Sequence, residues 1–203
     1  MKNTITKSKA GFTVVESLVA ITLLLLSIAG PMTLVVQGLR SAYYSSTQMT
    51  AFYLAQDAIE YVRNIRDTNN LAHRSDSSVS WLKGLEVCTA TTEGQPLATA
   101  LKCQIDTTVV PTCGATGCTA TGATNCAGGV CAYLKLDTTT ARYQYTTGNT
   151  SLYKREIQIV PLPSGVANGD GEAFVNVTVT WQASPFFPVK TIRLKTNLVN
   201  WQS

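Results

Sequence analysis

Six cysteines carry the most reactive side chains of this 203-residue chain, and all of them lie between Cys88 and Cys131. An even number of cysteines in a short stretch indicates disulfide bonds, which form in an oxidising compartment. A four-cysteine zinc site is the alternative, but the close C-x2-C spacing of such sites is absent. Six cysteines allow many pairings, and among them we expect sequence neighbours to join: Cys88 with Cys103, Cys113 with Cys118, and Cys126 with Cys131.

The other polar residues do not form a recognisable catalytic set. His73 is the only histidine, so neither a zinc site nor a Ser-His-Asp triad can be built around it, and we expect it to be exposed just past a helix. Residues 168–172, NGDGE, lack the spaced acids of an EF-hand, which favours a turn between strands. We therefore expect no enzyme activity, no catalytic residues, no metal, no cofactor and no small-molecule substrate.

A long apolar segment begins directly after Glu16. Residues 17–39 contain no charged side chain, and at about 1.5 Å per residue such a run is long enough to cross a bilayer. A carboxylate at the edge of this run is costly, so Glu16 is expected to have a partner or a function. Because proline removes a helical hydrogen bond, we expect a kink or local unwinding at Pro31.

A short basic leader precedes the apolar run. It contains Lys2, Lys7 and Lys9 and ends at Gly11, which is followed by Phe12. A secretory signal has the reverse order, with its apolar core before the cleavage site. The positive-inside rule keeps the leader in the cytoplasm, and the cysteines favour an oxidising exterior. We therefore expect a single-pass protein of the cytoplasmic membrane with its C-terminal part outside.

The junction between leader and apolar run resembles the N-terminal signal of type IV prepilins and pseudopilins. Gly11, Phe12 and Glu16 stand at the positions of that family's cleavage glycine, methylated N-terminal phenylalanine and acidic residue. The resemblance implies cleavage after Gly11 by a prepilin peptidase and methylation of Phe12. It also implies that the Glu16 carboxylate pairs with the amine of Phe12, on its own or a neighbouring subunit, during filament assembly.

The function implied by this resemblance is that of a structural subunit, a minor pilin or pseudopilin. Its partners would be the membrane, the peptidase and other pilin subunits, in a type IV pilus or a filament related to type II secretion. The filament would be extracellular or periplasmic.

Two alternatives remain open. In the first, the segment is a plain membrane anchor, and Thr13 and Glu16 form a capping box at the first helical turn. In the second, the chain is a membrane-anchored or pilus-tip module for adhesion or DNA binding. Without the three leader lysines, thirteen basic residues face twelve acidic ones, and this balance gives no electrostatic support for nucleic acid binding.

The segment after the apolar run predicts an amphipathic helix. Apolar and small residues recur there at spacings of three or four: Tyr43, Thr47, Ala51, Leu54, Ala58, Val62 and Ile65. Asn69 and Asn70 supply a stop signal, so a helix from Thr13 to Asp67 is expected. The chain then divides into a leader (1–11), a transmembrane half-helix (12–39), an amphipathic half-helix (40–68) and a globular, disulfide-containing head (69–203).

The head is expected to combine irregular segments with a sheet. Residues 75–136 predict loops and short strands tied by disulfides, and the strand candidates after them are 132–136, 142–145, 152–160, 174–182 and 189–199. In 174–182, Val175, Val177, Val179 and Trp181 alternate with polar residues, which predicts one buried and one wet face of an antiparallel sheet.

The expected fold class is α+β, a pilin-like fold in which a long N-terminal helix packs on a C-terminal antiparallel sheet. The C-terminal LVNW, residues 198–201, follows a VTVTW strand. This ending resembles the C-termini of PilV-like minor pilins.

Overall fold

The computed structural model describes residues 11–91, 94, 96–97, 99–162, 171–183 and 188–201. The chain forms two compact units, residues 1–47 and 48–203. One helix, α1 (Val14–His73), begins in the first unit and ends in the second. The leader lysines and most of the expected turn at 168–172 lie outside the described residues.

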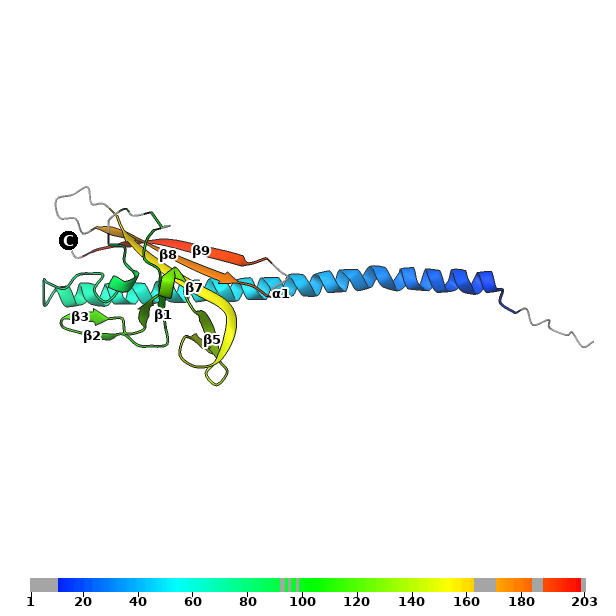
Figure 1. Ribbon diagram of the computed structural model, residues 1–203, viewed down its shortest axis with the longest axis horizontal. Coiled ribbons are helices and arrows are strands. Elements are labelled where there is room, and N and C mark those ends of the chain that lie inside the picture. Colours follow the sequence, from blue (N-terminus) through cyan, green and yellow to red (C-terminus); the bar gives the residue numbers. More distant parts are fainter. Residues whose placement is uncertain are drawn as a thin grey trace, which may run out of the picture. The chain divides into compact units, whose positions relative to one another are not determined.

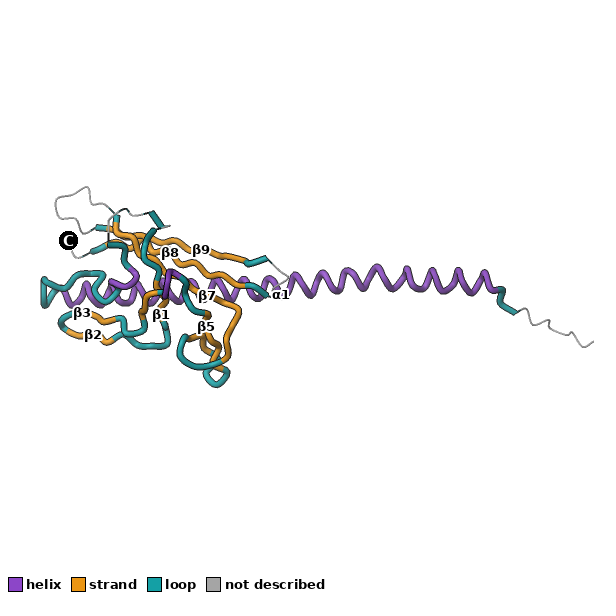
Figure 2. Tube along the Cα trace, viewed as in Figure 1, coloured by secondary structure: helices purple, strands orange, loops and turns teal. Residues whose placement is uncertain are grey.

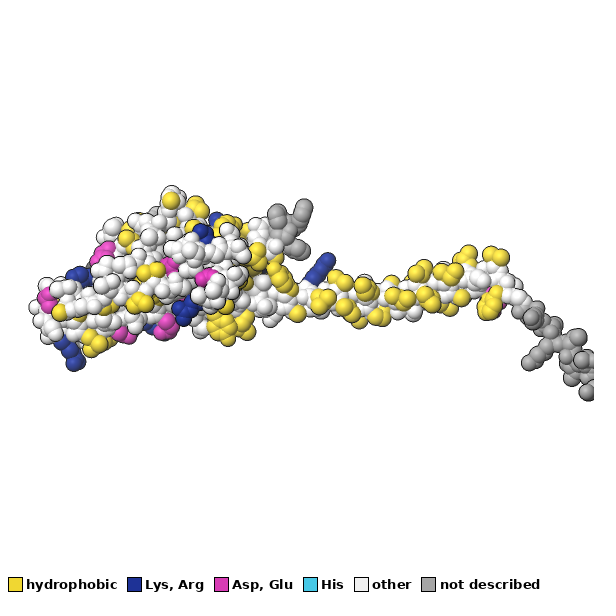
Figure 3. Space-filling model, turned by 90° about the horizontal axis from the view of Figure 1, so that it is seen from below, with side chains coloured by type: hydrophobic (Ala, Val, Ile, Leu, Met, Phe, Trp, Pro, Cys, Tyr) yellow, Lys and Arg dark blue, Asp and Glu magenta, His cyan; other side chains and the backbone are white. Residues whose placement is uncertain are grey.

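In the described part of the first unit, α1 has no buried residue before Thr47. Yellow apolar side chains cover this part of the helix in Figure 3. The Thr13 hydroxyl oxygen accepts a hydrogen bond from the Glu16 amide at 3.2 Å, so Thr13 is the N-cap of α1. This bond is one half of the capping box named as an alternative above; the other half, a bond to the Glu16 carboxylate, is not formed among the described residues.

Pro31 lies inside α1, which continues through it without a break. We expected a kink or local unwinding at Pro31. The helix is not unwound there, and a kink that leaves the helix continuous stays a prediction. A proline removes one amide donor, whereas the helical bonds on both sides of it remain and hold the backbone in register.

The helix extends beyond its expected end at Asp67 and finishes at His73. Asn69 and Asn70, expected to stop the helix, are both buried within it. His73 was expected to be exposed past the helix, but it is the last helical residue, and its Nδ1 lies 2.9 Å from the carbonyl oxygen of Val79. For Asn69 and His73, contacts with later parts of the chain outweigh the local preference for a helix end, whereas both side-chain polar atoms of Asn70 lack a hydrogen-bond partner within the described structure.

The second unit combines the end of α1 with short helices and antiparallel sheets (Figures 1 and 2). The 3-10 helices in the described part of this unit are η1 (Glu86–Cys88) and η2 (Ala127–Gly129). Its strands are β1 (Cys103–Ile105), β2 (Thr112–Gly114), β3 (Gly117–Thr119), β4 (Ala123–Asn125), β5 (Tyr133–Asp137), β6 (Arg142–Gln144), β7 (Asn149–Pro161), β8 (Glu172–Trp181) and β9 (Lys190–Val199). The fold class of the described chain is therefore α+β, as expected.

β7 organises the seven-stranded sheet because it pairs with β1 and β5 along one edge and with β8 along the other. β9 continues the sheet beyond β8, as expected from the sequence, with Glu172 opposite Val199 and Trp181 opposite Lys190. β2 and β3 form a separate two-stranded sheet. All these pairs of strands are antiparallel.

The hydrophobic core joins the second-unit part of α1 to one face of β7, β8 and β9. Its helical members are the buried residues of the expected stripe, together with neighbouring residues: Ala51, Leu54, Ala55, Ala58, Ile59, Tyr61, Val62 and Ile65. Its β8 members are Ala173 and, as expected, the four alternating residues Val175, Val177, Val179 and Trp181.

The opposite face of β8 is not wet along its whole length, contrary to expectation. Asn176 and Thr178 on this face are buried, and so is Gln158 of β7, which pairs with Asn176. Gln158 Nε2 donates to the carbonyl oxygens of Leu97 and Ala100, at 2.6 and 3.1 Å. The chain before β1 therefore covers part of this face, and its carbonyls satisfy the buried amide.

Candidate functional site

The residues of the expected processing signal lie at the start of α1. Gly11 and Phe12 precede the helix and are exposed, and a side chain at Gly11 would meet no atom within 4 Å. Glu16 lies in the first helical turn. The peptide bond between Gly11 and Phe12 is thus accessible, and Glu16 is within about one turn of it.

The Glu16 carboxylate has no hydrogen-bond or ion-pair partner among the described residues, and its residue is exposed. The side chains that follow it are almost all apolar and also exposed. A carboxylate beside such a surface is stabilised by water or by a positive charge from another molecule.

The apolar half of α1 is long and apolar enough to cross a membrane, and the most apolar part of it has no buried residue. Contiguous apolar surface of this extent marks a contact with lipid or with another protein. The chain therefore has one N-terminal apolar helix fit for a single-pass anchor. Signal sequences satisfy the same criteria of length and composition.

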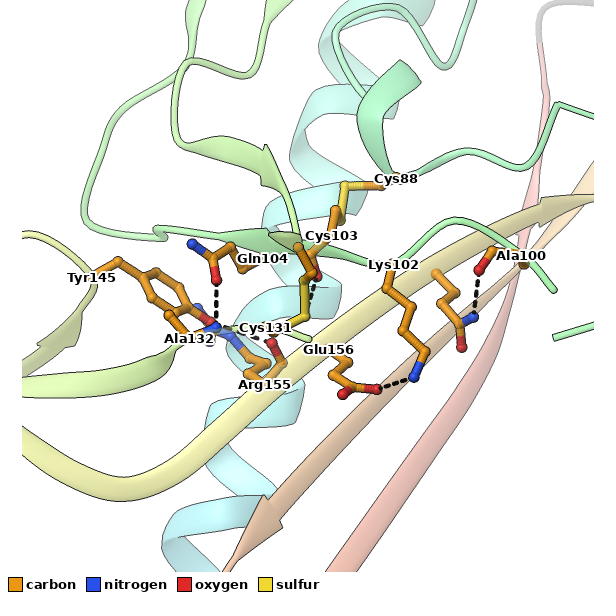
Figure 4. Close-up of a disulfide and its surroundings, with 12 residues drawn as sticks. Cys88, Ala100, Lys102, Cys103, Gln104, Cys131, Ala132, Tyr145, Arg155 and Glu156 are labelled. Carbon is orange, nitrogen blue, oxygen red and sulfur yellow. Dashed lines mark hydrogen bonds and ion pairs between the residues drawn. A yellow bond between two sulfur atoms is a disulfide. The ribbon is translucent and has the colours of Figure 1, made fainter. Parts of the chain in front are cut away.

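Three disulfides join the six cysteines in the pairs expected from their order: Cys88–Cys103, Cys113–Cys118 and Cys126–Cys131. The first links η1 to β1, and both of its residues are fully buried (Figure 4). The second lies across the β2–β3 ladder, where its two cysteines are opposite each other. Each bond thus ties a short element that has few backbone partners of its own.

Asn69 is a structural residue, although its local sequence predicted a helix stop. Its side-chain nitrogen donates to the carbonyl oxygens of Trp81 and Lys83 at 3.2 and 2.8 Å, and its oxygen accepts from the Cys118 amide at 2.7 Å. A Cβ at Gly117, which has φ +93°, would lie 3.0 Å from the Asn69 oxygen. Asn69 therefore fixes the β2–β3 hairpin and the segment after α1 to the last turns of the helix.

Arg155 is the largest fully buried side chain and was not recognised from the sequence. It is located in β7 between Tyr153 and Ile157 on the face that packs against α1 (Figure 4). In a strand, every second side chain points to the same face, and this alternation predicted that Tyr153 and Ile157 face the core. The same alternation places residue 155 on that face, so the sequence did contain a signal for the burial of Arg155.

The Arg155 guanidinium joins three elements. Nη1 donates to the Leu54 carbonyl oxygen at 2.8 Å and to Asp57 Oδ2 at 3.2 Å, and Nη2 donates to the Ile105 carbonyl oxygen at 2.6 Å. The hydroxyl of Thr107 also donates to Asp57 Oδ2. Nε has no hydrogen-bond partner within the described structure. The buried charge is therefore paired on one side and is surrounded by backbone dipoles.

A second buried charged group, Asp106, lies next to Ile105. Its Oδ1 accepts from the Thr108 amide and hydroxyl at 3.1 and 2.6 Å, and its Oδ2 accepts from the Tyr145 amide at 2.9 Å. Burial raises the pKa of the Tyr145 phenol, and the positive charge of Arg155 opposes this shift. Burial, and then the charge of Asp106, raise the pKa of Tyr61.

A cleft of about 370 Å³ lies within the second unit beside this network. The residues that line it come from α1, the loop after β1, and β6: Thr50, Tyr53, Leu54, Asp57, Thr107, Thr108, Arg142 and Tyr143. Among the described residues, no group of three or more His, Cys, Asp or Glu side chains could hold a metal ion. The cleft offers polar and aromatic contacts.

Comparisons with protein-family models, with curated proteins and with solved structures found no match to this chain.

Proposed function

We propose that this chain is a prepilin-like structural subunit, a minor pilin or pseudopilin of a type IV pilus or of a filament related to type II secretion. The observation that supports this most is the start of α1, where an accessible Gly11–Phe12 bond directly precedes a helix with an exposed apolar surface. The carboxylate of Glu16 in this helix has no partner among the described residues. Cleavage at this bond would create a positively charged amine close to the Glu16 carboxylate.

The opposite charges of the new Phe12 amine and the Glu16 carboxylate support this function. An amine and a carboxylate at the same end of an apolar helix neutralise each other between neighbouring subunits, and in a low-dielectric surrounding this pairing sets the register of the helices. The apolar side chains after Glu16 would exchange lipid for the helices of other subunits. The proposed subunit is held in the cytoplasmic membrane before assembly, with its disulfide-containing second unit outside.

This proposal and a secretory signal differ in how much of α1 the mature protein keeps. Cleavage after the apolar run would separate residues 14–39 from the part of α1 that contributes to the core. Cleavage after Gly11 leaves the whole helix in the mature protein.

Mass spectrometry of the N-terminus tests the proposal. The full chain is expressed together with a prepilin peptidase, and we expect a mature N-terminus at Phe12 carrying a methyl group. A Gly11→Val variant should keep its leader. Gly38→Val is the matched control, because Gly38 is also exposed and a Cβ added there would meet no atom within 4 Å, and it should be cleaved normally. An intact leader on the unaltered chain, or a cut after the apolar run, would contradict the proposal.

A further inference from the structure

The cleft beside the Arg155 network contains a positive and a negative group that the fold does not fully use. Arg142 is exposed, and its guanidinium has no partner among the described residues. Asp57 is held through Oδ2 by Arg155 and Thr107, and its Oδ1 has no partner in the same part of the chain. The Asp57 side chain is 52% exposed, so this second oxygen is available to a ligand.

Two tyrosines complete the cleft. Tyr53 lines it from α1 and is 62% exposed. Tyr143 lines it from β6, and its ring packs edge-on against the buried Tyr153, with ring centroids 5.7 Å apart and an interplanar angle of 87°. The Tyr143 ring is therefore packed against the core, whereas the Tyr53 ring is mostly exposed and contacts only its neighbour Phe52 among the described aromatic rings.

This combination of groups selects among ligand classes. A simple anion would bind Arg142 but leave Asp57 Oδ1 without a donor, and a simple cation would bind Asp57 but leave Arg142 without an acceptor. A neutral ligand would use neither charge fully. A zwitterion satisfies both, because an ammonium group pairs with a carboxylate and is attracted to tyrosine faces, whereas a guanidinium binds phosphate oxygens in a fork.

We propose that the cleft binds a zwitterionic ammonium phosphate, the chemistry of phosphoethanolamine and phosphocholine. The ammonium lies between Asp57 Oδ1 and the rings of Tyr53 and Tyr143, and the phosphate binds Arg142. The volume of about 370 Å³ is within the usual range of small-ligand sites, roughly 300–1,000 Å³. Phospholipid head groups and soluble phosphate esters share this chemistry, and the membrane source alone rests on the proposed membrane anchorage.

The binding test uses the full chain in a non-ionic detergent. Phosphoethanolamine, phosphocholine, inorganic phosphate and ethanolamine are titrated separately, and binding is followed by isothermal calorimetry. We expect saturable binding of the two zwitterions, and binding at least tenfold weaker for phosphate or ethanolamine alone. Arg142→Gln and Tyr53→Ala should each weaken zwitterion binding about tenfold or more. Arg74→Gln, which removes another exposed cation of the same unit, should leave it unchanged.

A second arm distinguishes the two sources. The chain is reconstituted in nanodiscs of phosphatidylglycerol alone or with added phosphatidylethanolamine, and phosphoethanolamine is titrated again. Weaker apparent binding in the mixed nanodiscs identifies the lipid head group as the ligand, and equal binding identifies the soluble ester.

Three results would overturn the proposal: no saturable binding at millimolar zwitterion, equal binding of inorganic phosphate, or equal binding by Arg142→Gln. None of these results bears on the N-terminal processing test, so the two proposals can fail separately.

Discussion

Arg155 Nη1 lies 2.8 Å from the carbonyl oxygen of Leu54, so a charged side chain from the middle strand of the sheet bonds to the backbone of α1. Within a helix, a carbonyl oxygen already accepts from the amide four residues later, and its second lone pair can accept another donor. The same guanidinium reaches the Ile105 carbonyl of β1. Arg155 therefore connects the helix, β1 and β7 at one point inside the core.

Replacing Arg155 by methionine should destabilise the second unit strongly. The change keeps most of the buried volume but leaves two buried carbonyls without this donor and Asp57 without its cation, which should cost roughly 3 kcal/mol. A fall in Tm of about 6–12 °C corresponds to that loss. Thermal unfolding in detergent, followed by tryptophan fluorescence, measures it. Arg74→Gln is the control, and an equal Tm for Arg155→Met and the unaltered chain would disprove the structural role of Arg155.

Asn69→Ala should loosen the attachment of the β2–β3 hairpin to α1. The variant loses bonds to the carbonyls of Trp81 and Lys83 and to the Cys118 amide, with an expected cost of about 2 kcal/mol. Hydrogen exchange should show faster exchange of the Cys118 amide. Asn64→Ala provides a matched comparison because Asn64 is exposed on the same helix. Unaltered exchange at Cys118 in Asn69→Ala would speak against this attachment.

The three disulfides should contribute unequally to stability. Cys88 and Cys103 are 15 residues apart in the sequence, whereas the other two pairs are each 5 apart. Loop-closure entropy then assigns about 3 kcal/mol to the first bond and about 2 kcal/mol to each of the others. Paired Cys→Ser variants, compared by Tm, should lose most stability in the Cys88/Cys103 pair. The largest loss in another pair would contradict this order.

Alkaline pH should destabilise the second unit, partly through Tyr145. Burial raises the pKa of its phenol above the ordinary value of about 10. The unfolded chain therefore releases this proton at lower pH than the folded chain, so the stability from Tyr145 is present below about pH 10 and is lost as pH rises towards the folded pKa. Tm measured between about pH 9 and 11 should fall less steeply for Tyr145→Phe than for the unaltered chain.

The control for the alkaline experiment is Tyr133→Phe, because Tyr133 is 46% exposed. It should retain the slope of the unaltered chain. A Tyr145→Phe slope identical to that of the unaltered chain would exclude Tyr145 as a source of the pH dependence.

Glu16→Val should leave processing after Gly11 intact but reduce incorporation into filaments. The variant removes the carboxylate proposed to pair with the new amine of Phe12 and leaves no charged side chain in the first turn of α1. Immunoblotting of sheared filaments and of membranes measures the two pools, and we expect the variant to accumulate in the membrane. Asp67→Asn, a charge change at the other end of α1, is the control. Equal incorporation of Glu16→Val would remove this role from Glu16.

The spacing of apolar residues in the sequence predicted those helices and strands that bury one face against the core. The five strand candidates correspond to β5 through β9 because alternating apolar residues face one core, and the helical stripe from Ala51 to Ile65 is buried for the same reason. The disulfide pairs follow sequence order because each bond closes a short local loop.

Features that depend on long-range polar contacts were not predictable in the same way. Asn69 has the local signature of a helix stop, and only its bonds to residues later in the chain explain why α1 continues. Arg155 occupies an inward position, but a charged residue does not indicate burial by composition. The second face of β8 looked solvent-exposed because its cover comes from a segment without a periodic pattern.

Arg155 and Leu54, which are joined by a hydrogen bond, are 101 residues apart in the sequence. This separation determines which parts of the second unit can fold first during synthesis. During synthesis, the helical stripe emerges long before β7, β8 and β9, so its core partners do not yet exist. Contacts of such high sequence separation form slowly because a long loop must close first. The second unit therefore completes folding only after the last strands have been made, and until then those strands do not cover the stripe.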